Sequence, residues 1–547
     1  MSLNPNFEYS ISDESETGLT VLTLTDKKTG IVVNTIIPNS KNPVASIQSY
    51  VASRYSRSSD TVIELLSDLV TKKQDSVKIM GKIFRDYGHA SVADMAGVFV
   101  YIENIPSLYA TRFFMESSVG AGMERSTRYQ DFGKNIQIAE LCDYNIELNH
   151  ERYEPLNTEF MNIQNLSLEL YNKWYNVLYE LYQDKYNIDV ENKNERDALK
   201  ARTFDSARSF LPWGSYNRTS LGYLTSAREW SRLISLYKGE KDPILKQVGE
   251  MLELLLAPEK EIQDKLGFKA EVYDLIRYTQ GVETTSNNLD SLRQWLDYNE
   301  HLFGYYDFQH SQYLGVSVIP NLSGVQKMIL GYIYVLNPFE VMHNLDEFVQ
   351  FMSPKMTSEI LKIISKNHTH HNQLPIMART GDYMLHIDCP YSEVRDLNRH
   401  RSFGRYCPMV LSDSPECSTA SKKQTYILPD YIYYLGEDII AEFKNDLKEY
   451  TSELTKLEHS FKNYPKLHRL LKQVWLFAVN SPFVMMGGIK EIHYLTHQRV
   501  RPGGHINYRH LMRLIRDELV EHDESLIHIF PDSDVDTESI QQFKDRS

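Results

Sequence analysis

The sequence of 547 residues predicts a globular fold of mixed helices and strands in which a strand–helix unit occurs twice. Residues 19–38 carry β-branched side chains on both sides of a turn at 26–30, which is typical of two strands joined as a hairpin. Strands are also expected at 96–104 and 382–388, each followed at once by a helical segment containing arginine. Ile387 matches Ile102 in this comparison, 285 residues away, which indicates a divergent internal repeat.

One long helix is expected between these strands. Its apolar side chains recur at spacings of three, four and seven residues and form a single stripe, made of Leu156, Phe160, Ile163, Leu170, Trp174, Val177 and Leu181. This stripe is interpreted as core.

The composition excludes several classes of partner. A formal net charge of -14 and a pI of about 5.7 argue against bulk attraction to nucleic acid or to an anionic membrane. No apolar run approaches the roughly 20 residues that cross a bilayer, and the N-terminus has no basic start followed by an apolar core, so no signal peptide is expected. The four cysteines, Cys142, Cys389, Cys407 and Cys417, are too sparse for a disulfide framework. A cytoplasmic protein is therefore expected.

The segment "ERSTRY", residues 124–129, has the composition of a phosphate site. It offers a carboxylate, two hydroxyls and two guanidinium groups just after the glycine-bearing loop "VGAGM". Backbone N–H groups, hydroxyls and a forked arginine together suit a phosphate. The alternative is a helix start with Ser126 or Thr127 as the N-cap.

The segment "RDLNRHRSFGRY", residues 395–406, concentrates four arginines and a histidine. Consecutive side chains of a helix point in different directions, so the "RHR" at 399–401 can surround an anion. Only Glu393 and Asp396 are near enough in sequence to pair with these cations.

A third basic cluster covers residues 491–518. Within it "RPGGH" is typical of a helix end, a turn and a new helix start, where the helix N-terminus adds partial positive charge. Neither its histidines nor those of "NHTHH" at 367–371 have nearby cysteines or paired carboxylates, so no metal site is predicted. Cys407 is expected to be a buried structural residue, since nothing around it supports a nucleophile.

The order of these motifs resembles the flavin-dependent thymidylate synthases, also called thymidylate synthase complementing proteins. The carrying segments are "GHASVADMAGVFVYIENIPS", "ERSTRY", "ARSFLP", "RDLNRHR" and "HQRVRPGGHINYR". The family signature RHRxxSxNExSxRY is split here, with its second half at 124–129 and its first half at 399–401. The likeness spans most of residues 45–520 and is greatest to long members with two fused units.

The resemblance implies an α+β fold of two tandem, divergent synthase-like units, each with a mainly antiparallel sheet and long helices. Residues 1–40 would form an N-terminal β-hairpin extension, 41–290 the first unit with the nucleotide half-site, and 300–547 the second unit with the flavin half-site. The polar stretch 279–291 is the expected linker. A homodimer forming a pseudo-tetramer is expected, because single-unit relatives are tetramers.

The resemblance also implies roles for individual residues. The dUMP-binding set would be Glu124, Ser126, Thr127, Arg128, Arg208 and Arg499. The FAD-binding set would be His89, Ser91, Arg399, His400, Arg401, Lys490 and His505. Arg499, Arg399 and His400 are the expected catalytic residues, with Arg499 polarising the uracil ring.

Each unit departs from the family pattern in a different half. The first has "FFMES" at 113–117 where "RHR" is expected, and the second runs from "RHR" into "SFGRYCP" without the glutamate and serine. Complementary losses favour one site shared between the units. Degeneration of both sites is the alternative.

The implied reaction is methylation of dUMP to dTMP with methylenetetrahydrofolate and NADPH, with FAD as cofactor and dUMP and folate as small-molecule partners. One alternative is another C5 modification of a pyrimidine nucleotide on the same scaffold. A second is a non-catalytic nucleotide-binding scaffold.

Overall fold

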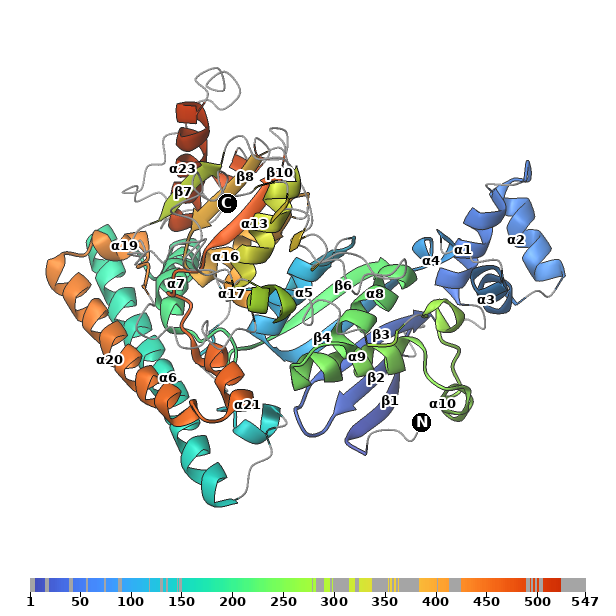
Figure 1. Ribbon diagram of the computed structural model, residues 1–547, viewed down its shortest axis with the longest axis horizontal. Coiled ribbons are helices and arrows are strands. Elements are labelled where there is room, and N and C mark those ends of the chain that lie inside the picture. Colours follow the sequence, from blue (N-terminus) through green and yellow to red (C-terminus); the bar gives the residue numbers. More distant parts are fainter. Residues whose placement is uncertain are drawn as a thin grey trace.

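A computed structural model describes residues 5–295, 314–336, 383–487 and 492–522, with gaps inside each range, and a few isolated residues between 298 and 363. Helices and antiparallel sheets both contribute to it, so the predicted α+β class is confirmed (Figure 1).

The first sheet has six antiparallel strands in the order β1-β2-β3-β4-β6-β5. They are β1 (Phe7–Glu14), β2 (Leu19–Asp26), β3 (Val32–Pro38), β4 (Gly97–Pro106), β5 (Ala121–Glu124) and β6 (Arg218–Ser226). The predicted hairpin is β2 and β3, and its turn is stabilised by the Asp26 carboxylate, which accepts the Thr29 N–H at 3.1 Å. Because β3 also pairs with β4, the hairpin continues the main sheet, and β1 adds a strand that was not predicted.

The second sheet has four antiparallel strands in the order β7-β8-β10-β9. They are β7 (Gly315–Ile319), β8 (Tyr383–Asp388), β9 (Gly404–Tyr406) and β10 (Phe483–Gly487). This order repeats that of β3-β4-β6-β5. The matching strands β4 and β8 each lead into a helix whose N-cap is a proline. Pro106 precedes α5 (Ser107–Glu116), and Pro390 precedes α16 (Tyr391–Leu397). The predicted strand–helix repeat is thus present, which supports two tandem units.

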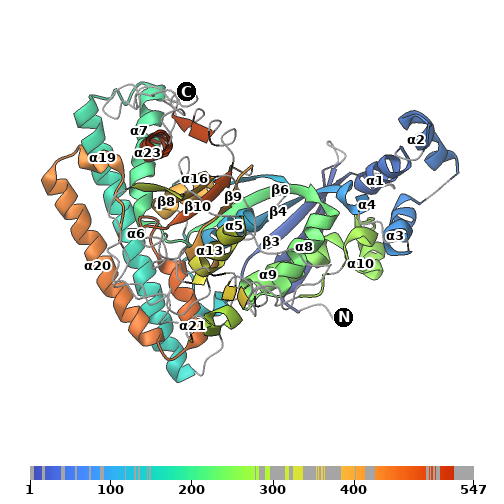
Figure 2. The ribbon, with the colours of Figure 1, turned by 45° about the horizontal axis from the view of Figure 1, so that its top comes forward.

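Two long helices, α6 (His150–Tyr186) and α20 (Glu437–Phe461), lie side by side along one flank (Figures 1 and 2). Trp174 of α6 packs on Phe443 of α20 with ring centroids 4.5 Å apart, and its indole N–H donates to Asp446 at 2.8 Å. Most of the predicted stripe is buried, which confirms its interpretation as core, although Val177 and Leu181 are only half-buried.

The remaining helices cover the sheets or extend from them. On the first half these are α1 (Val44–Tyr55), α2 (Val62–Thr71), α3 (Ser76–Asp86), α4 (Ser91–Asp94), α7 (Lys193–Ala207), α8 (Ala227–Lys238), α9 (Pro243–Leu256) and α10 (Lys260–Leu266). On the second half they are α13 (Gly324–Leu336), α17 (Pro408–Leu411), α19 (Asp430–Tyr433), α21 (Pro465–His468) and α23 (Ile506–His522). No helix in the ranges given above is both long and apolar enough to cross a membrane.

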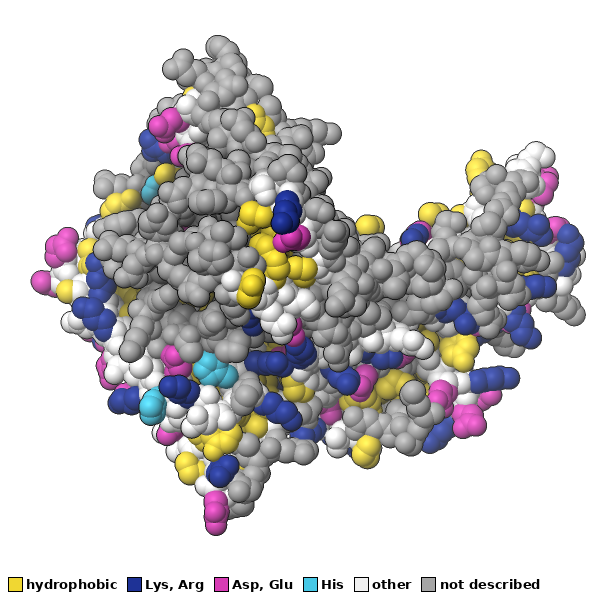
Figure 3. Space-filling view, viewed as in Figure 1, with side chains coloured by type: hydrophobic (Ala, Val, Ile, Leu, Met, Phe, Trp, Pro, Cys, Tyr) yellow, Lys and Arg dark blue, Asp and Glu magenta, His cyan; other side chains and the backbone are white. Residues whose placement is uncertain are grey.

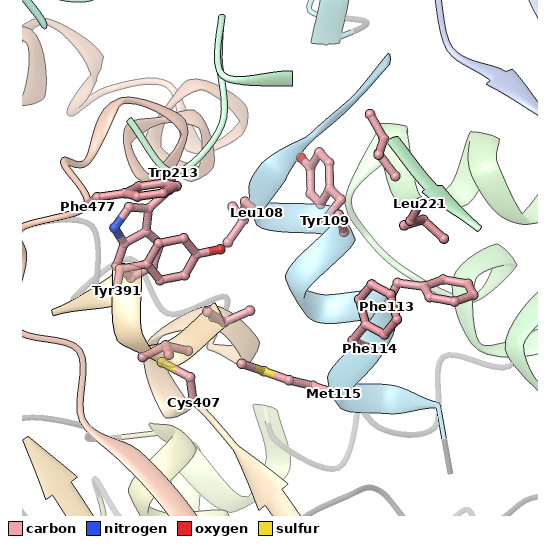
Figure 4. Close-up of a cluster of buried hydrophobic side chains, with 14 of the residues drawn as sticks. Leu108, Tyr109, Phe113, Phe114, Met115, Trp213, Leu221, Tyr391, Cys407 and Phe477 are labelled. Atoms are coloured by element: carbon pink, nitrogen blue, oxygen red, sulfur yellow. The ribbon is translucent and has the colours of Figure 1, made fainter. Parts of the chain in front are cut away.

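The two halves meet through a shared core. Backbone segments before β6 and β10 pair with each other, as the Trp213 N–H donates to the Trp475 carbonyl and the Phe477 N–H to the Leu211 carbonyl, both at 2.6 Å. Trp213 stacks on Tyr391 at 4.2 Å, and Met115 of α5 extends toward the fully buried Cys407 (Figure 4). Division at 41–290 and 300–547 stays a proposal, and residues 282–289 of the predicted linker lie outside the described residues.

Basic and acidic side chains are mixed on the surface. On the face seen in Figure 3, the described Lys and Arg side chains are interspersed with Asp and Glu.

Candidate functional site

The structure describes many of the predicted site residues. Side chains are described for Glu124, Ser126, Thr127, Arg208, Arg399, His400, Arg499 and His505. His89, Arg128, Arg401 and Lys490 lie outside the described residues, and Ser91 is described only as the first residue of α4.

The predicted nucleotide half-site begins where β5 ends. Glu124 pairs with Leu221 of β6, and the following residues 125–127 are loop. A helix capped by Ser126 or Thr127 would begin within residues 128–130, which lie outside the described residues. Gly122 is required within β5, because a Cβ at this position would lie 2.4 Å from the Tyr223 ring. Thr127 is buried and accepts a hydrogen bond from Nη1 of Arg208 at 3.5 Å.

Arg208 joins this loop to the second half of the chain. It follows α7 in the 3₁₀ turn η2 (Arg208–Phe210) and is 2% exposed. Its Nη2 lies 3.3 Å from Glu393 Oε1 and 3.4 Å from Asp396 Oδ2, both on α16. Glu393 and Asp396, the two carboxylates near enough in sequence to pair with the "RHR" cations, thus both contact a cation from the other unit.

A second ion pair also joins the first half of the chain to the second half. Nη2 of Arg395, on α16, pairs with Glu124 and also donates to the Arg125 carbonyl at 3.4 Å. Both partners of the pair are about 95% buried. Glu124 of one split half of the signature is thus held against Arg395, four residues before the other half, within one chain.

The "RHR" segment separates its side chains as expected for consecutive residues. Arg399 is exposed, whereas His400 is buried against Tyr508 of α23, whose hydroxyl lies 2.9 Å from His400 Nε2. Nε of Arg499 donates to the same His400 nitrogen at 3.2 Å, and its guanidinium lies over the Tyr508 ring at 5.7 Å.

His400 is neutral in this setting. Burial, with the nearby Arg499 and Arg405 charges, lowers the pKa of His400 from 6.5 to about 3. A neutral imidazole can accept the Arg499 N–H and orient that guanidinium without cancelling its charge. Arg499 has no carboxylate partner among the residues described.

The acid sensitivity of the fold offers a first prediction. The unfolded chain protonates His400 below about pH 6.5, but the folded chain resists this down to about pH 3, so His400 destabilises the fold as the pH falls through this window. At about pH 5 this effect should lower the free energy of unfolding by about 2 kcal/mol. His400→Gln should accordingly lose less thermal stability than wild type between about pH 7.5 and about pH 5.

His510 provides a control of opposite sign. Its hydrogen bond to Asp430 raises the pKa of His510, so its contribution is present at low pH and is lost as the pH rises. His510→Gln should therefore increase the acid sensitivity. Equal pH profiles for wild type and His400→Gln would contradict the assignment of a buried neutral ring.

His505 lies just before α23, close to the carboxylate that Arg208 contacts. It is 1% exposed, and its Nδ1 is 3.0 Å from Oε1 of the fully buried Glu393. Neither ring nitrogen makes a hydrogen bond within the described part of the chain. The same is true of Arg208 Nε and of Arg395 Nε and Nη1. Buried donors are normally satisfied, so this cluster suits an anionic or carbonyl-bearing ligand.

Sequence reasoning missed the partners of these residues. Arg395 stood in a quoted motif but received no role, and Tyr508 was not singled out. Arg395 lies four residues before Arg399, but α16 ends between them and only Arg395 is buried, so their spacing gave no usable signal.

The position in the first unit that corresponds to His400 is occupied by different residues. Counted from the N-cap prolines, Glu116 stands where His400 stands in the second unit. It pairs with Arg112 at 2.9 Å, Arg112 also pairs with Glu240, and Arg232 donates to the Glu116 carbonyl. Internal ion pairs thus occupy the first-unit counterpart.

The second-unit counterpart of the "ERSTRY" segment also differs from it. Tyr406 lies opposite Val484 as Glu124 lies opposite Leu221. The neighbouring Arg405 is fully buried and donates to the carbonyls of Asn398, Phe403 and Phe114 at 2.7, 3.3 and 3.0 Å. Arg405 therefore has a structural role in closing this position.

Residues 36–252 match the family of thymidylate synthase complementing proteins, so the resemblance seen in the sequence is confirmed. A Chlamydia pneumoniae protein described as a UPF0159 protein is 19% identical over 470 residues, which cover 83% of this chain and 80% of that protein.

Solved structures show weaker similarity. A UMP/dUMP methylase from Streptomyces cacaoi, bound to 5-bromo-dUMP, is 14% identical over 51% of this chain and 97% of its own, with a TM-score of 0.27. A Helicobacter pylori flavin-dependent thymidylate synthase with FAD and dUMP is 12% identical over 43% of this chain and 96% of its own, with a TM-score of 0.25. TM-scores this low do not establish a common fold across the chain.

Proposed function

We propose, on the premise that residues 36–252 match the thymidylate synthase complementing proteins, that this chain methylates dUMP to dTMP in a flavin-dependent reaction. Methylenetetrahydrofolate would supply the one-carbon unit and NADPH the reducing equivalents, giving tetrahydrofolate and NADP⁺. The protein would act in the cytoplasm, as a homodimer with the arrangement of a pseudo-tetramer.

The observation that carries this proposal is the set of buried arginines between the two units. Arg208 and Arg395 are at least nine-tenths buried and retain N–H groups without a partner among the described residues. Leaving such donors unsatisfied costs about 1–3 kcal/mol each, so an anionic nucleotide bound there would recover that free energy.

The nucleotide would be held mainly by the first unit. Its proposed ligands are Glu124, Ser126, Thr127, Arg128 and Arg208. Arg499 would reach the uracil ring from the second unit, where its charge stabilises the negative charge that develops on the ring oxygens as C5 becomes nucleophilic. The neutral His400 holds the Arg499 guanidinium in position through the contact at 3.2 Å.

The second unit supplies most of the proposed flavin site. Its ligands would be Arg399, His400, Arg401, Lys490 and His505, with His89 and Ser91 from the first unit. The exposed Arg399 and the unpartnered Nε2 of His505 suit the phosphates and the polar ring edge of FAD, respectively. When bound, FAD supplies the redox chemistry, and the protein provides orientation and charge.

Ligand stoichiometry tests this function. The pure full-length protein should bind one FAD and one dUMP per chain, because ion pairs of Arg112 and Arg232 occupy the first-unit counterpart. Flavin absorbance and equilibrium titration with dUMP measure both numbers. Product analysis by mass spectrometry separates methylation from another C5 modification.

Two results would count against this reading. Protein that ignores added FAD would exclude the flavoenzyme. Binding of both ligands without turnover would favour the non-catalytic scaffold.

A further inference from the structure

Arg395 is a buried cation to which neither the family resemblance nor the proposed mechanism assigns a role. It lies on α16, is 6% exposed, and its guanidinium carbon sits 5.4 Å from the centre of the Phe477 ring. Glu124 holds its Nη2 from the opposite unit. The ring and the carboxylate together fix the guanidinium plane before any ligand arrives.

The hydrogen bonding of Arg395 is incomplete. Its Nε and Nη1 have no partner in the part of the chain that is described. Arg405, ten residues later and fully buried, donates through all three nitrogens to backbone carbonyls. Among the described residues, Arg395 by contrast uses only Nη2, which leaves two of its three nitrogens for a ligand.

The surroundings of Arg395 indicate which part of a nucleotide it would meet. Its contacts with Glu124 and the Arg125 carbonyl place it on the loop that continues to Ser126 and Thr127. Arg208, with an unpartnered Nε of its own, reaches the same loop at Thr127. A phosphate monoester carries close to two negative charges at neutral pH and three strong acceptor oxygens, which match two buried guanidinium groups.

We propose that Arg395 is a phosphate ligand of the nucleotide, contributed by the second unit to the first unit's loop. The proposal rests on the proposed function and extends it, because it makes phosphate recognition depend on both units. Arg208 and Arg395 would share the phosphate charge, while Arg499 acts at the ring.

The test compares dUMP with deoxyuridine, which lacks the phosphate. In the full-length protein, Arg395→Gln should weaken dUMP binding by about 10- to 150-fold, as for loss of a charge-assisted hydrogen bond. Deoxyuridine affinity, measured by competition, should change less than about twofold. Arg228→Gln is the matched control, since Arg228 is exposed, pairs with Asp94, and should leave both affinities unchanged.

The variant Arg395→Lys separates a loss of phosphate binding from a loss of folding. Lysine keeps a positive charge opposite Glu124 but removes the planar donors, so it should still lower dUMP affinity selectively. An equal loss for dUMP and deoxyuridine in both variants, or no loss in either, would overturn the phosphate assignment. Wild-type protein that binds no dUMP would instead overturn the proposed function, and the phosphate assignment with it.

Discussion

Replacing Arg499 with alanine is expected to lower kcat for dTMP formation by about 10²- to 10³-fold, the usual effect of removing one preorganised donor to a developing negative charge. The residue is suited to this because its guanidinium is held by the neutral His400 and the Tyr508 ring and has no carboxylate partner among the described side chains. The rate is measured in single turnovers with pre-reduced flavin, so that the flavin reduction step does not mask the effect.

Two matched variants make this result specific. Arg499→Lys keeps the charge but loses the geometry of the Nε contact, and it should recover only part of the rate. Arg513→Ala removes an exposed arginine of α23 that faces Asp517, and it should leave the rate unchanged. A normal single-turnover rate in Arg499→Ala would show that another group polarises the ring.

Mixed oligomers of two inactive variants should show no recovery of activity. Arg208 and Arg499 belong to different units, and Arg208 contacts α16 of its own chain. The two variants, Arg208→Ala and Arg499→Ala, are co-expressed with different tags and purified as mixed oligomers. Each chain would then contain only a damaged site. A site built between chains would instead restore an intact pair of residues in the mixture.

Mixed oligomers of wild type with either variant provide the control, since their activity should follow the wild-type content. Recovery in the doubly mutant mixture would contradict assembly of the site within one chain. It would leave the proposed reaction intact.

The sequence alone was sufficient for features that depend on neighbours along the chain. The hairpin at 19–38, the strands β4 and β8 and the long helix α6 were predicted because alternation and helical periodicity are local patterns. The basic clusters were also visible, since charge density in a dozen residues needs no fold to be counted. The strand β1 was missed although Phe7, Tyr9 and Ile11 alternate as strand residues do.

The tertiary structure decided which charge meets which. Glu393 and Asp396 are the carboxylates nearest in sequence to the "RHR" cations, yet both contact Arg208 from the other unit. Glu124 pairs with Arg395, 271 residues away, and His400 is neutral because it is buried beside other cations. An ion pair or a shifted pKa depends on distance and on loss of water, and both are set by packing between distant segments. For this reason the sequence could indicate an anion site in each half. Only the fold could join the halves and leave Arg395 with N–H groups that no described residue accepts.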